Sequence, residues 1–114
     1  MGLAREIIKI HRTGEHAVVG FRGNDIVDDV NLVEVRDEML AMIAKNQTKT
    51  VAFDLTGVRF LPSGLLGLLA SIRKTGVEVH LHNPCEEIRE TLAITNLNRL
   101  MSIHDEPIVI GAPQ

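Results

Sequence analysis

Residues 51–69 decide the fold of this chain, and they read VAFDLTGVRFLPSGLLGLL. The run over residues 50–56 is mostly apolar and ends at Gly57, which is typical of a strand buried at the centre of a sheet. The residues that follow are apolar almost all round at helical spacing, which predicts a buried helix over residues 64–75. We expect Ser63 to be the N-cap of that helix.

The chain before this stretch predicts a β-hairpin and then a long helix. Two short runs rich in β-branched residues, 6–11 and 17–21, are separated by a turn that contains a glycine. Asn31, followed three residues later by Glu34, forms a capping-box pattern. Apolar residues then recur at helical spacing, and we expect this helix to end near residues 45–46.

The chain after this stretch predicts a strand, a helix and a short edge strand. Residues 77–82 alternate between apolar and polar side chains, and a helix is expected over residues 86–94. Asn83 is the expected cap of that helix, with Pro84 as its first residue. With an edge strand over residues 107–110, the order ββαβαβα predicts an α/β fold with a mixed sheet of four to five strands.

The composition excludes several classes of protein. The 114 residues include 12 Lys+Arg and 15 Asp+Glu, a net charge of −3, and fit one domain over residues 1–114. There are three Phe and no Tyr or Trp, whereas readers of single-stranded nucleic acid stack bases on aromatic side chains in a positive groove. We therefore expect no nucleic acid among the partners.

The cellular compartment is indicated by the cysteine content and by the apolar stretches. The single cysteine, Cys85, cannot form an internal disulfide, which suits a reducing compartment. Charged residues occupy the start of the chain, where a signal peptide needs its apolar run. The longest apolar stretches are far shorter than the ~20 residues that span a bilayer. We expect a cytoplasmic protein without membrane insertion.

No motif predicts an enzyme, a cofactor or a metal site. Neither of the glycine-rich loops that bind nucleotide phosphates occurs in the chain. His80 and His82 share one face of a predicted strand, but the sequence provides no evident third ligand. The role of this histidine pair stays open.

Ser63 has two roles open to it at the start of a helix. As a cap, its oxygen accepts a backbone N–H bond, which stabilises a helix by about 1 kcal/mol. As a phosphoacceptor, it would carry a charge of about −1.5 to −2. A helix N-terminus tolerates an anion well, so phosphorylation would leave the fold intact while changing the charge that a partner meets.

Residues 51–69 resemble the core of STAS domains, the sulphate-transporter and anti-sigma-factor-antagonist family. Its members usually have Asp-Leu-Ser at a strand end, a short turn, and Asp-Ser-Ser/Thr-Gly at the start of a leucine-rich helix. The resemblance continues through residues 77–84 and 88–103. It implies a mixed sheet with helices packed mainly on one face. Gly64 and Gly67 would let the leucine-rich helix approach another backbone closely.

The resemblance implies a non-catalytic protein of signal transduction and transcription regulation, whose partner is an anti-sigma factor or serine kinase of that type. In the family, phosphorylation of the serine before the glycine breaks the complex, and by position that serine is Ser63. Asp54 matches the strand-end carboxylate, and Thr56 matches the hydroxyl near it. Leu61 stands where the family usually has Asp, and Pro62 replaces the first of its two hydroxyl residues.

The expected partner surface consists of Ser63 and the residues around it, and two alternatives stay open. If Phe60 and Leu61 are exposed, they form an apolar patch that favours a partner different from the usual kinase. One alternative is a STAS module without a phospho-switch, a scaffold or a subunit of a transport complex, in which Ser63 is only a cap. The other is a receiver-like domain phosphorylated on Asp54. The residues around Ser63 in this expected surface are Asp54, Thr56, Phe60, Leu61, Pro62 and Gly64.

Overall fold

The computed structural model describes residues 8–21, 32–106 and 108, and a five-stranded sheet lies at their centre. The strands follow one another across the sheet in chain order; β1 pairs with β2 antiparallel, and all other pairs are parallel. The predicted mixed sheet is therefore confirmed. The strands are β1 (Ile8–Arg12), β2 (His16–Phe21), β3 (Thr50–Asp54), β4 (Glu78–His82) and β5 (Ser102–His104).

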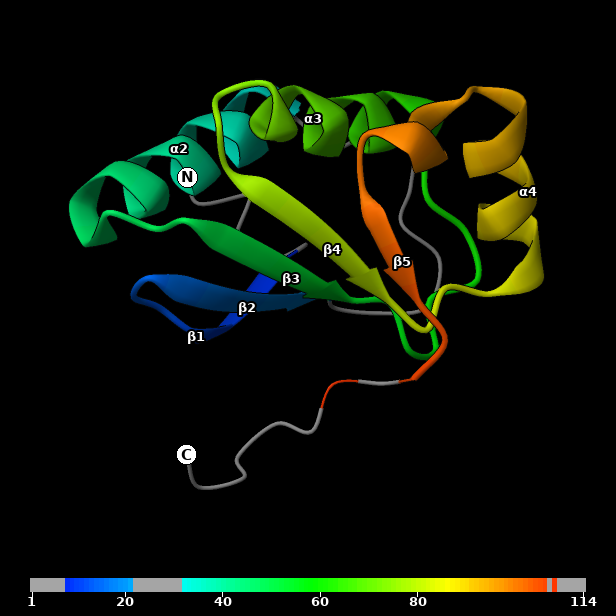
Figure 1. Cartoon of the computed structure of the whole chain (residues 1–114), viewed down its shortest axis with the longest axis horizontal. Coiled ribbons are helices and arrows are strands. Elements are labelled where there is room, and N and C mark those ends of the chain that lie inside the picture. Colours follow the sequence, from blue (N-terminus) through cyan, green and yellow to red (C-terminus); the bar gives the residue numbers. More distant parts are fainter. Residues whose placement is uncertain (1–7, 22–31, 107, 109–114) are drawn as a thin grey trace.

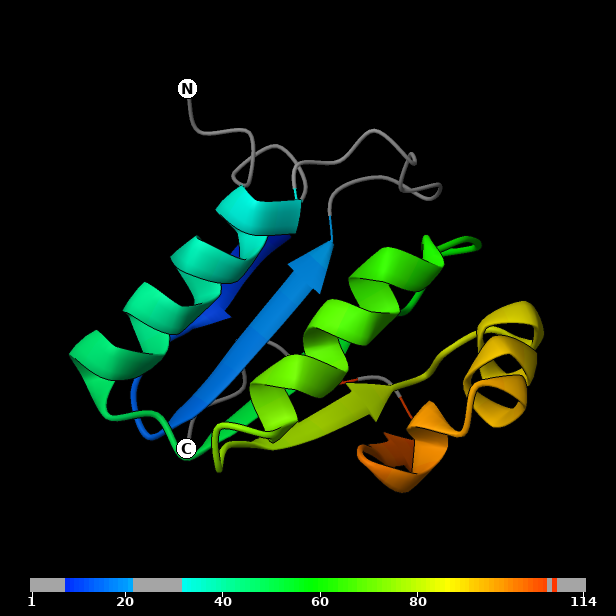
Figure 2. The same cartoon turned by 90° about the horizontal axis from the view of Figure 1, so that it is seen from above.

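The helices lie on one side of this sheet. Figures 1 and 2 show α2 and α3 side by side across one face, with α4 beyond the edge formed by β5. None of the described helices is both long and apolar enough to cross a membrane. The helical elements are α2 (Leu32–Asn46), α3 (Ser63–Arg73), α4 (Glu86–Ile94) and the short 3-10 helix η1 (Leu97–Arg99).

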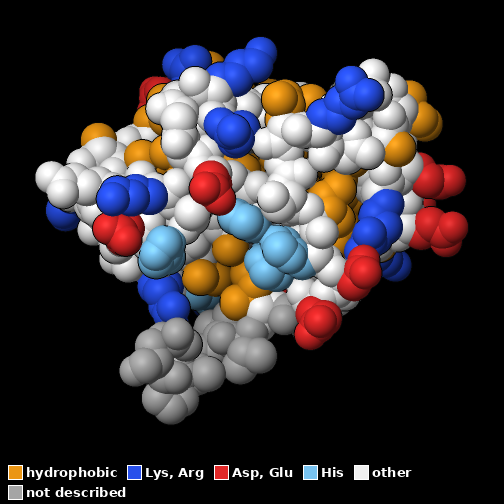
Figure 3. Space-filling model, viewed as in Figure 1, with side chains coloured by type: hydrophobic (Ala, Val, Ile, Leu, Met, Phe, Trp, Pro, Cys, Tyr) orange, Lys and Arg blue, Asp and Glu red, His pale blue; other side chains and the backbone are white. Residues whose placement is uncertain are grey.

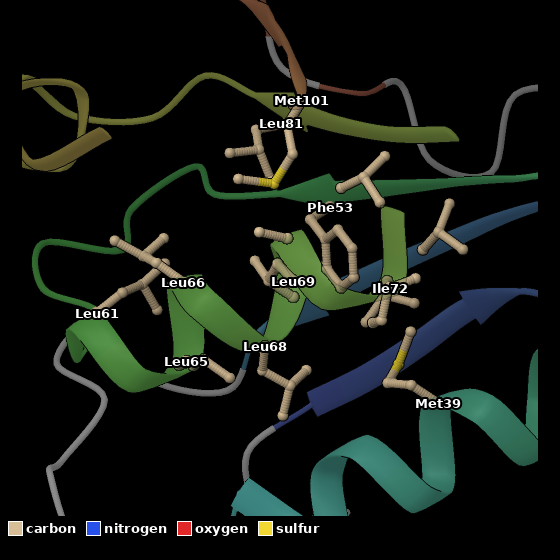
Figure 4. Packing of buried hydrophobic residues seen from close by; sticks show 14 of the residues in the cluster. Met39, Phe53, Leu61, Leu65, Leu66, Leu68, Leu69, Ile72, Leu81 and Met101 are labelled. Atoms are coloured by element: carbon tan, nitrogen blue, oxygen red, sulfur yellow. The ribbon is translucent and has the colours of Figure 1, made fainter. Parts of the chain in front are cut away.

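The core fills the space between the sheet and these helices. Strand side chains alternate, so every second one points toward α2 and α3, and we call this side the inner face. Phe53 of β3 is 1% exposed, and its ring stacks on that of Phe21 with 6.0 Å between centroids. Figure 4 shows Phe53 packed beside Leu69 and Ile72 of α3. Each such side chain contributes about 1.5–3 kcal/mol through burial.

The opposite side of the sheet, which we call the outer face, is not covered by any described helix (Figure 1). Strand alternation and register place Ala52, Asp54 and their neighbours on this face. All five histidines of the chain lie on it. Four occupy outer positions of strands, and the ring of His11 fills the space that a side chain at Gly20 would need. The histidines are His11, His16, His80, His82 and His104.

The start of α3 differs from the sequence prediction. The helix begins with Ser63 itself, and the N-cap residue is Pro62. The carbonyl oxygen of Pro62 accepts hydrogen bonds from the backbone N–H groups of Leu65 (3.0 Å) and Leu66 (3.2 Å). Because these bonds start the helix one residue earlier, the prediction that Ser63 is the N-cap is wrong.

The start of α4 also differs. Its N-cap residue is Cys85, so Pro84 precedes the helix, and the predicted Asn83 cap is wrong. Asn83 instead adopts a left-handed backbone with φ of 56°, which asparagine tolerates better than most residues. Its N–H donates to the carbonyl oxygen of His104 over 2.8 Å. The chain therefore turns at the end of β4 before the helix starts.

The last described strand lies at residues 102–104, and the predicted edge strand over residues 107–110 falls mostly outside the described residues. Ser102–His104 adds to the parallel part of the sheet beside β4, and Ile103 packs against the core. Of the predicted segment only Ile108 is described, and it is not in a strand. The predicted Asn31 cap lies outside the described residues as well.

Candidate functional site

The residues singled out in the sequence lie where the parallel strands end. The carboxyl ends of β2 to β5 meet at one edge of the sheet, because these strands are parallel. The loop 55–62 joins the end of β3 to the start of α3, and the loop 83–85 joins the end of β4 to α4. We call these two loops, together with Ser63 and Gly64, the Ser63 corner.

Asp54 shapes the turn that follows β3. Its Oδ1 accepts a hydrogen bond from the backbone N–H of Thr56 over 3.1 Å, and Gly57 has a φ of 81° that favours glycine. The N–H of Leu55 donates to the carbonyl oxygen of His82 over 2.9 Å, which extends the contact with β4. The single charge in this buried strand therefore holds the turn that leads to Ser63.

Two hydrogen bonds tie the loops of the Ser63 corner together. The side-chain amide of Asn83 donates to Oγ1 of Thr56 over 3.1 Å. The Sγ of Cys85 donates to the carbonyl oxygen of Arg59 over 3.6 Å. Through these bonds the loop after β3 is held by the loop after β4. The structure thus brings Asp54 and Thr56 into one hydrogen-bonded turn system.

Phe60 and Leu61 point in different directions. Phe60 is 47% exposed, whereas Leu61 is 4% exposed and lies in the core near Leu65 and Leu66 (Figure 4). Pro62 is also buried. The apolar patch of Phe60 and Leu61 does not form, because the chain enters α3 with Leu61 turned inward. Phe60 is the apolar side chain that this loop presents at the surface.

The two glycines of α3 differ in their surroundings. A side chain at Gly64 would come within 2.8 Å of Cδ1 of Leu32, so glycine here lets the start of α2 approach α3. The neighbour is a side chain, not the backbone that the sequence suggested. Gly67 has no atom within 4 Å of the position that a side chain would take, so it does not serve close packing. The first turn of α3 contains no acidic residue.

Three histidines meet on the outer face, close to the carboxyl end of β4. Nδ1 of His80 and Nε2 of His104 are 2.9 Å apart, and the ring of His82 stacks on that of His104 with 4.3 Å between centroids. Figure 3 shows histidine side chains gathered on the surface below the helices. The sequence pointed to His80 and His82 but missed His104, whose place depends on the pairing of β4 with β5.

The environment of this cluster lowers the pKa of His82. Burial lowers it below the usual 6.5, and so do the charges that His104 and His80 carry when protonated; a hydrogen bond to the Glu106 backbone and the charge of Asp54 act in the opposite direction. A lowered pKa keeps this imidazole neutral at pH 7. With the side chains as they stand, the described part of the chain contains no group of three His, Cys, Asp or Glu residues arranged to hold a metal ion.

Comparisons with known proteins agree with this architecture. The anti-sigma factor antagonist SpoIIAA in its unphosphorylated form has a similar structure, with a TM-score of 0.71 and 18% identity over 84% of this chain and 86% of that one. SpoIIAA in the phosphorylated form, described as a Bacillus cell fate determinant, gives a TM-score of 0.59 and 19% identity over 84% and 89%. No curated protein sequence matches the chain significantly. The sequence profile of the STAS domain matches residues 8–107, so the chain belongs to the STAS domain family.

Proposed function

We propose that this chain is a non-catalytic regulator of the anti-sigma-factor-antagonist kind, which binds a protein partner in the cytoplasm through the Ser63 corner. The partner is an anti-sigma factor or a serine kinase of that type, and phosphorylation of Ser63 ends the complex. The observation that carries this proposal is the place of Ser63 as the first residue of α3, directly before Gly64. SpoIIAA, which shares the fold, is described in both an unphosphorylated and a phosphorylated form.

The charge balance at the start of α3 supports a phosphorylated state. A helix N-terminus carries about half a positive charge, which favours an anion in the first turn. The first turn of α3 has no acidic residue to supply that charge, whereas the first turn of α4 has Glu86 and Glu87. A phosphate on Ser63 would add about −1.5 to −2 charge where the helix accepts it. The fold would survive modification, and a partner would meet a different surface.

The rigidity of the Ser63 corner supports partner binding. Hydrogen bonds from Thr56 to Asp54 and from Asn83 to Thr56 hold the loop before the partner arrives. A surface held in this way loses less conformational entropy on binding than a mobile loop does. Phe60, which is 47% exposed, offers an aromatic contact beside a shallow hollow of about 40 Å³ that it lines with Glu87 and Thr91 of α4.

One observation favours the alternative of a STAS module without a switch. Position 61, where the family usually has Asp, is a leucine that is 4% exposed and part of the core. This chain therefore lacks the carboxylate that would accompany the phosphoacceptor, and the side chain of Leu61, packed in the core, takes its place. In this alternative the Ser63 corner still binds a partner, as a scaffold or a subunit of a transport complex, but no modification controls the binding.

The receiver-like alternative receives less support. A receiver begins with a single strand, whereas β1 and β2 form an antiparallel hairpin. The Asp54 carboxylate accepts a hydrogen bond from the Thr56 N–H, so it takes part in the turn that follows β3.

The test uses four versions of the chain as bait in a lysate of the native host: wild type, Ser63→Ala, Ser63→Asp and Ser71→Asp. Ser71 lies two turns further along α3 and is exposed, so Ser71→Asp adds the same charge away from the Ser63 corner. We expect wild type, Ser63→Ala and Ser71→Asp to retain the same partner. Ser63→Asp should retain at most about a tenth of it, since a like charge placed in an interface costs several kcal/mol.

The result separates the two functions within the family. Retention of the partner by Ser63→Asp at the wild-type level contradicts the switch and favours the constitutive module. Equal loss with Ser71→Asp would instead mean that added charge on α3, and not the state of Ser63, governs binding. Circular dichroism of the four proteins serves as the control that each remains folded.

A further inference from the structure

The outer face brings together three histidines that the proposed function does not use. His80 and His82 are two positions apart on β4, so their side chains point to the same side of the sheet. His104 lies directly opposite His82 in the parallel pairing of β4 with β5. All three side chains are partly exposed, and a sheet backbone fixes their attachment points. Three imidazoles therefore lie side by side on two neighbouring strands.

The distances within the cluster are close to those of a three-histidine metal site. Two nitrogens bound to one tetrahedral zinc ion, each about 2.0–2.1 Å from it, are roughly 3.3 Å apart, which places the ring centroids about 5 Å apart. In this protein the centroids are 4.3 Å (His82–His104), 5.1 Å (His80–His104) and 6.5 Å (His80–His82) apart. Nδ1 of His80 and Nε2 of His104 are 2.9 Å apart, so they need to separate only slightly to hold an ion between them.

A hydrogen bond already orients the ring of His80. Nε2 of His80 lies 3.3 Å from Oε1 of Glu78, which leaves Nδ1 directed at His104. Histidines that bind metals usually donate their second ring N–H to a carboxylate or a backbone carbonyl, because this fixes the ring and makes it a better ligand.

The surroundings are accessible and acidic. A hollow of about 620 Å³ on the outer face is lined by His82 and His104 together with Asp105 and Glu106. Asp54 lies opposite His82 on β3 and faces the same side. A cation can thus approach the cluster from solvent, and the charges of Asp54 and Glu106 favour it, whereas Asp105 is already paired with Arg89 over 2.6 Å.

We propose that His80, His82 and His104 bind a divalent transition-metal ion of the zinc, copper and nickel group. The stacked rings do not hold an ion as they stand, and rotation of the three side chains closes the site. The hydrogen bond between His80 and His104 is then exchanged for two metal–nitrogen bonds, and each neutral ring keeps its proton on the nitrogen facing away from the ion. Three imidazole ligands suit these metals and leave a fourth position for water.

The experiment measures zinc binding to the full chain without a histidine tag, after removal of metals with a chelator. Isothermal titration with zinc chloride should give one site, and zinc should raise the melting temperature. Substitution of asparagine for His80, His82 or His104 should each weaken binding by more than about 10-fold, the smallest loss usual for an outer partner of a metal ligand. His16→Asn is the matched control, since His16 lies on the same face but bonds to Thr50 at the other end of the strands.

Nuclear magnetic resonance of the imidazole groups separates a built site from adventitious binding. We expect zinc to shift the ring signals of His80, His82 and His104 together, with saturation at one equivalent, while His11 and His16 stay unchanged. The proposal is overturned if zinc does not bind, if binding is so weak that it does not saturate, or if His16→Asn weakens it as much as His82→Asn. It is also overturned if only one of the three rings responds.

Discussion

The inner and outer faces of the sheet are built from the same strands but from different kinds of residue. On β3, Val51 and Phe53 face inward and are at most 1% exposed, while Ala52 and Asp54 face outward and remain partly exposed. The inner face packs against α2 and α3, and the outer face bears all five histidines. Because successive side chains of a strand alternate between the two faces, the inner face supplies the buried contacts that stabilise the fold, and the outer face presents its side chains to solvent.

This division has a consequence for mutations. Substitutions on the inner face remove contacts in a close-packed core, whose neighbours relax only partly. Substitutions on the outer face remove exposed contacts that water replaces. Three sets of substitutions test this contrast, and urea unfolding measures the effect of each on the free energy of unfolding.

The largest effect is expected for Phe53→Ala. The ring is 1% exposed and stacks on Phe21, so its removal should lower the free energy of unfolding by about 3–5 kcal/mol. The control is Ala52→Ser, which changes the neighbouring outer residue and should shift stability by less than about 0.5 kcal/mol. A similar loss in the free energy of unfolding for the two variants would mean that the outer face is buried as well.

A smaller effect is expected at two glycines, one inside α3 and one after its end. Gly76 has a φ of 99°, so Gly76→Ala should cost about 1–2 kcal/mol through backbone strain. Gly67→Ala should stabilise the protein by about 0.5–1 kcal/mol, since Gly67 lies inside the helix and no atom within 4 Å would clash with a methyl group. If both variants change stability in the same direction, the helix layer is packed differently from this description.

The smallest effect is expected for Glu78→Gln on the outer face. The carboxylate is 66% exposed and its contact with His80 spans 3.3 Å, so its loss should change the free energy of unfolding by less than about 0.5 kcal/mol in metal-free buffer. A loss above 1 kcal/mol would show that the outer face also stabilises the fold.

Much of the fold could be predicted from residue patterns. The alternation over residues 77–82 and the apolar run over residues 50–56 predicted β4 and β3. The helix over residues 86–94 was also predicted, although its cap was placed at Asn83 and lies at Cys85. β5 was missed because Ser102–His104 is too short to show a pattern, and its place depends on pairing with β4. Local sequence does not report such long-range pairing.

The details of the site were harder to predict. The sequence placed Leu61 beside Ser63 but could not decide which way its side chain points, and packing against Leu65 and Leu66 turns it into the core. The pair Asn83 and Pro84 fits either the start of a helix or a turn that precedes one. The hydrogen bond from the Asn83 N–H to the His104 carbonyl oxygen shows that it forms the turn. His104 lies 22 residues beyond His82, so only the sheet shows that the two meet.

The most direct test of a switch at Ser63 compares one partner with two states of the same chain. The partner recovered with Ser63→Ala is purified, and its affinity is measured for the unmodified chain and for the chain phosphorylated by a serine kinase, with intact mass and peptide mapping to verify one phosphate on Ser63. We predict tight binding to the unmodified chain and at least a tenfold loss after phosphorylation, about 1.4 kcal/mol. Equal affinity for both states, or a Ser63 that no kinase of the host modifies, would contradict the switch.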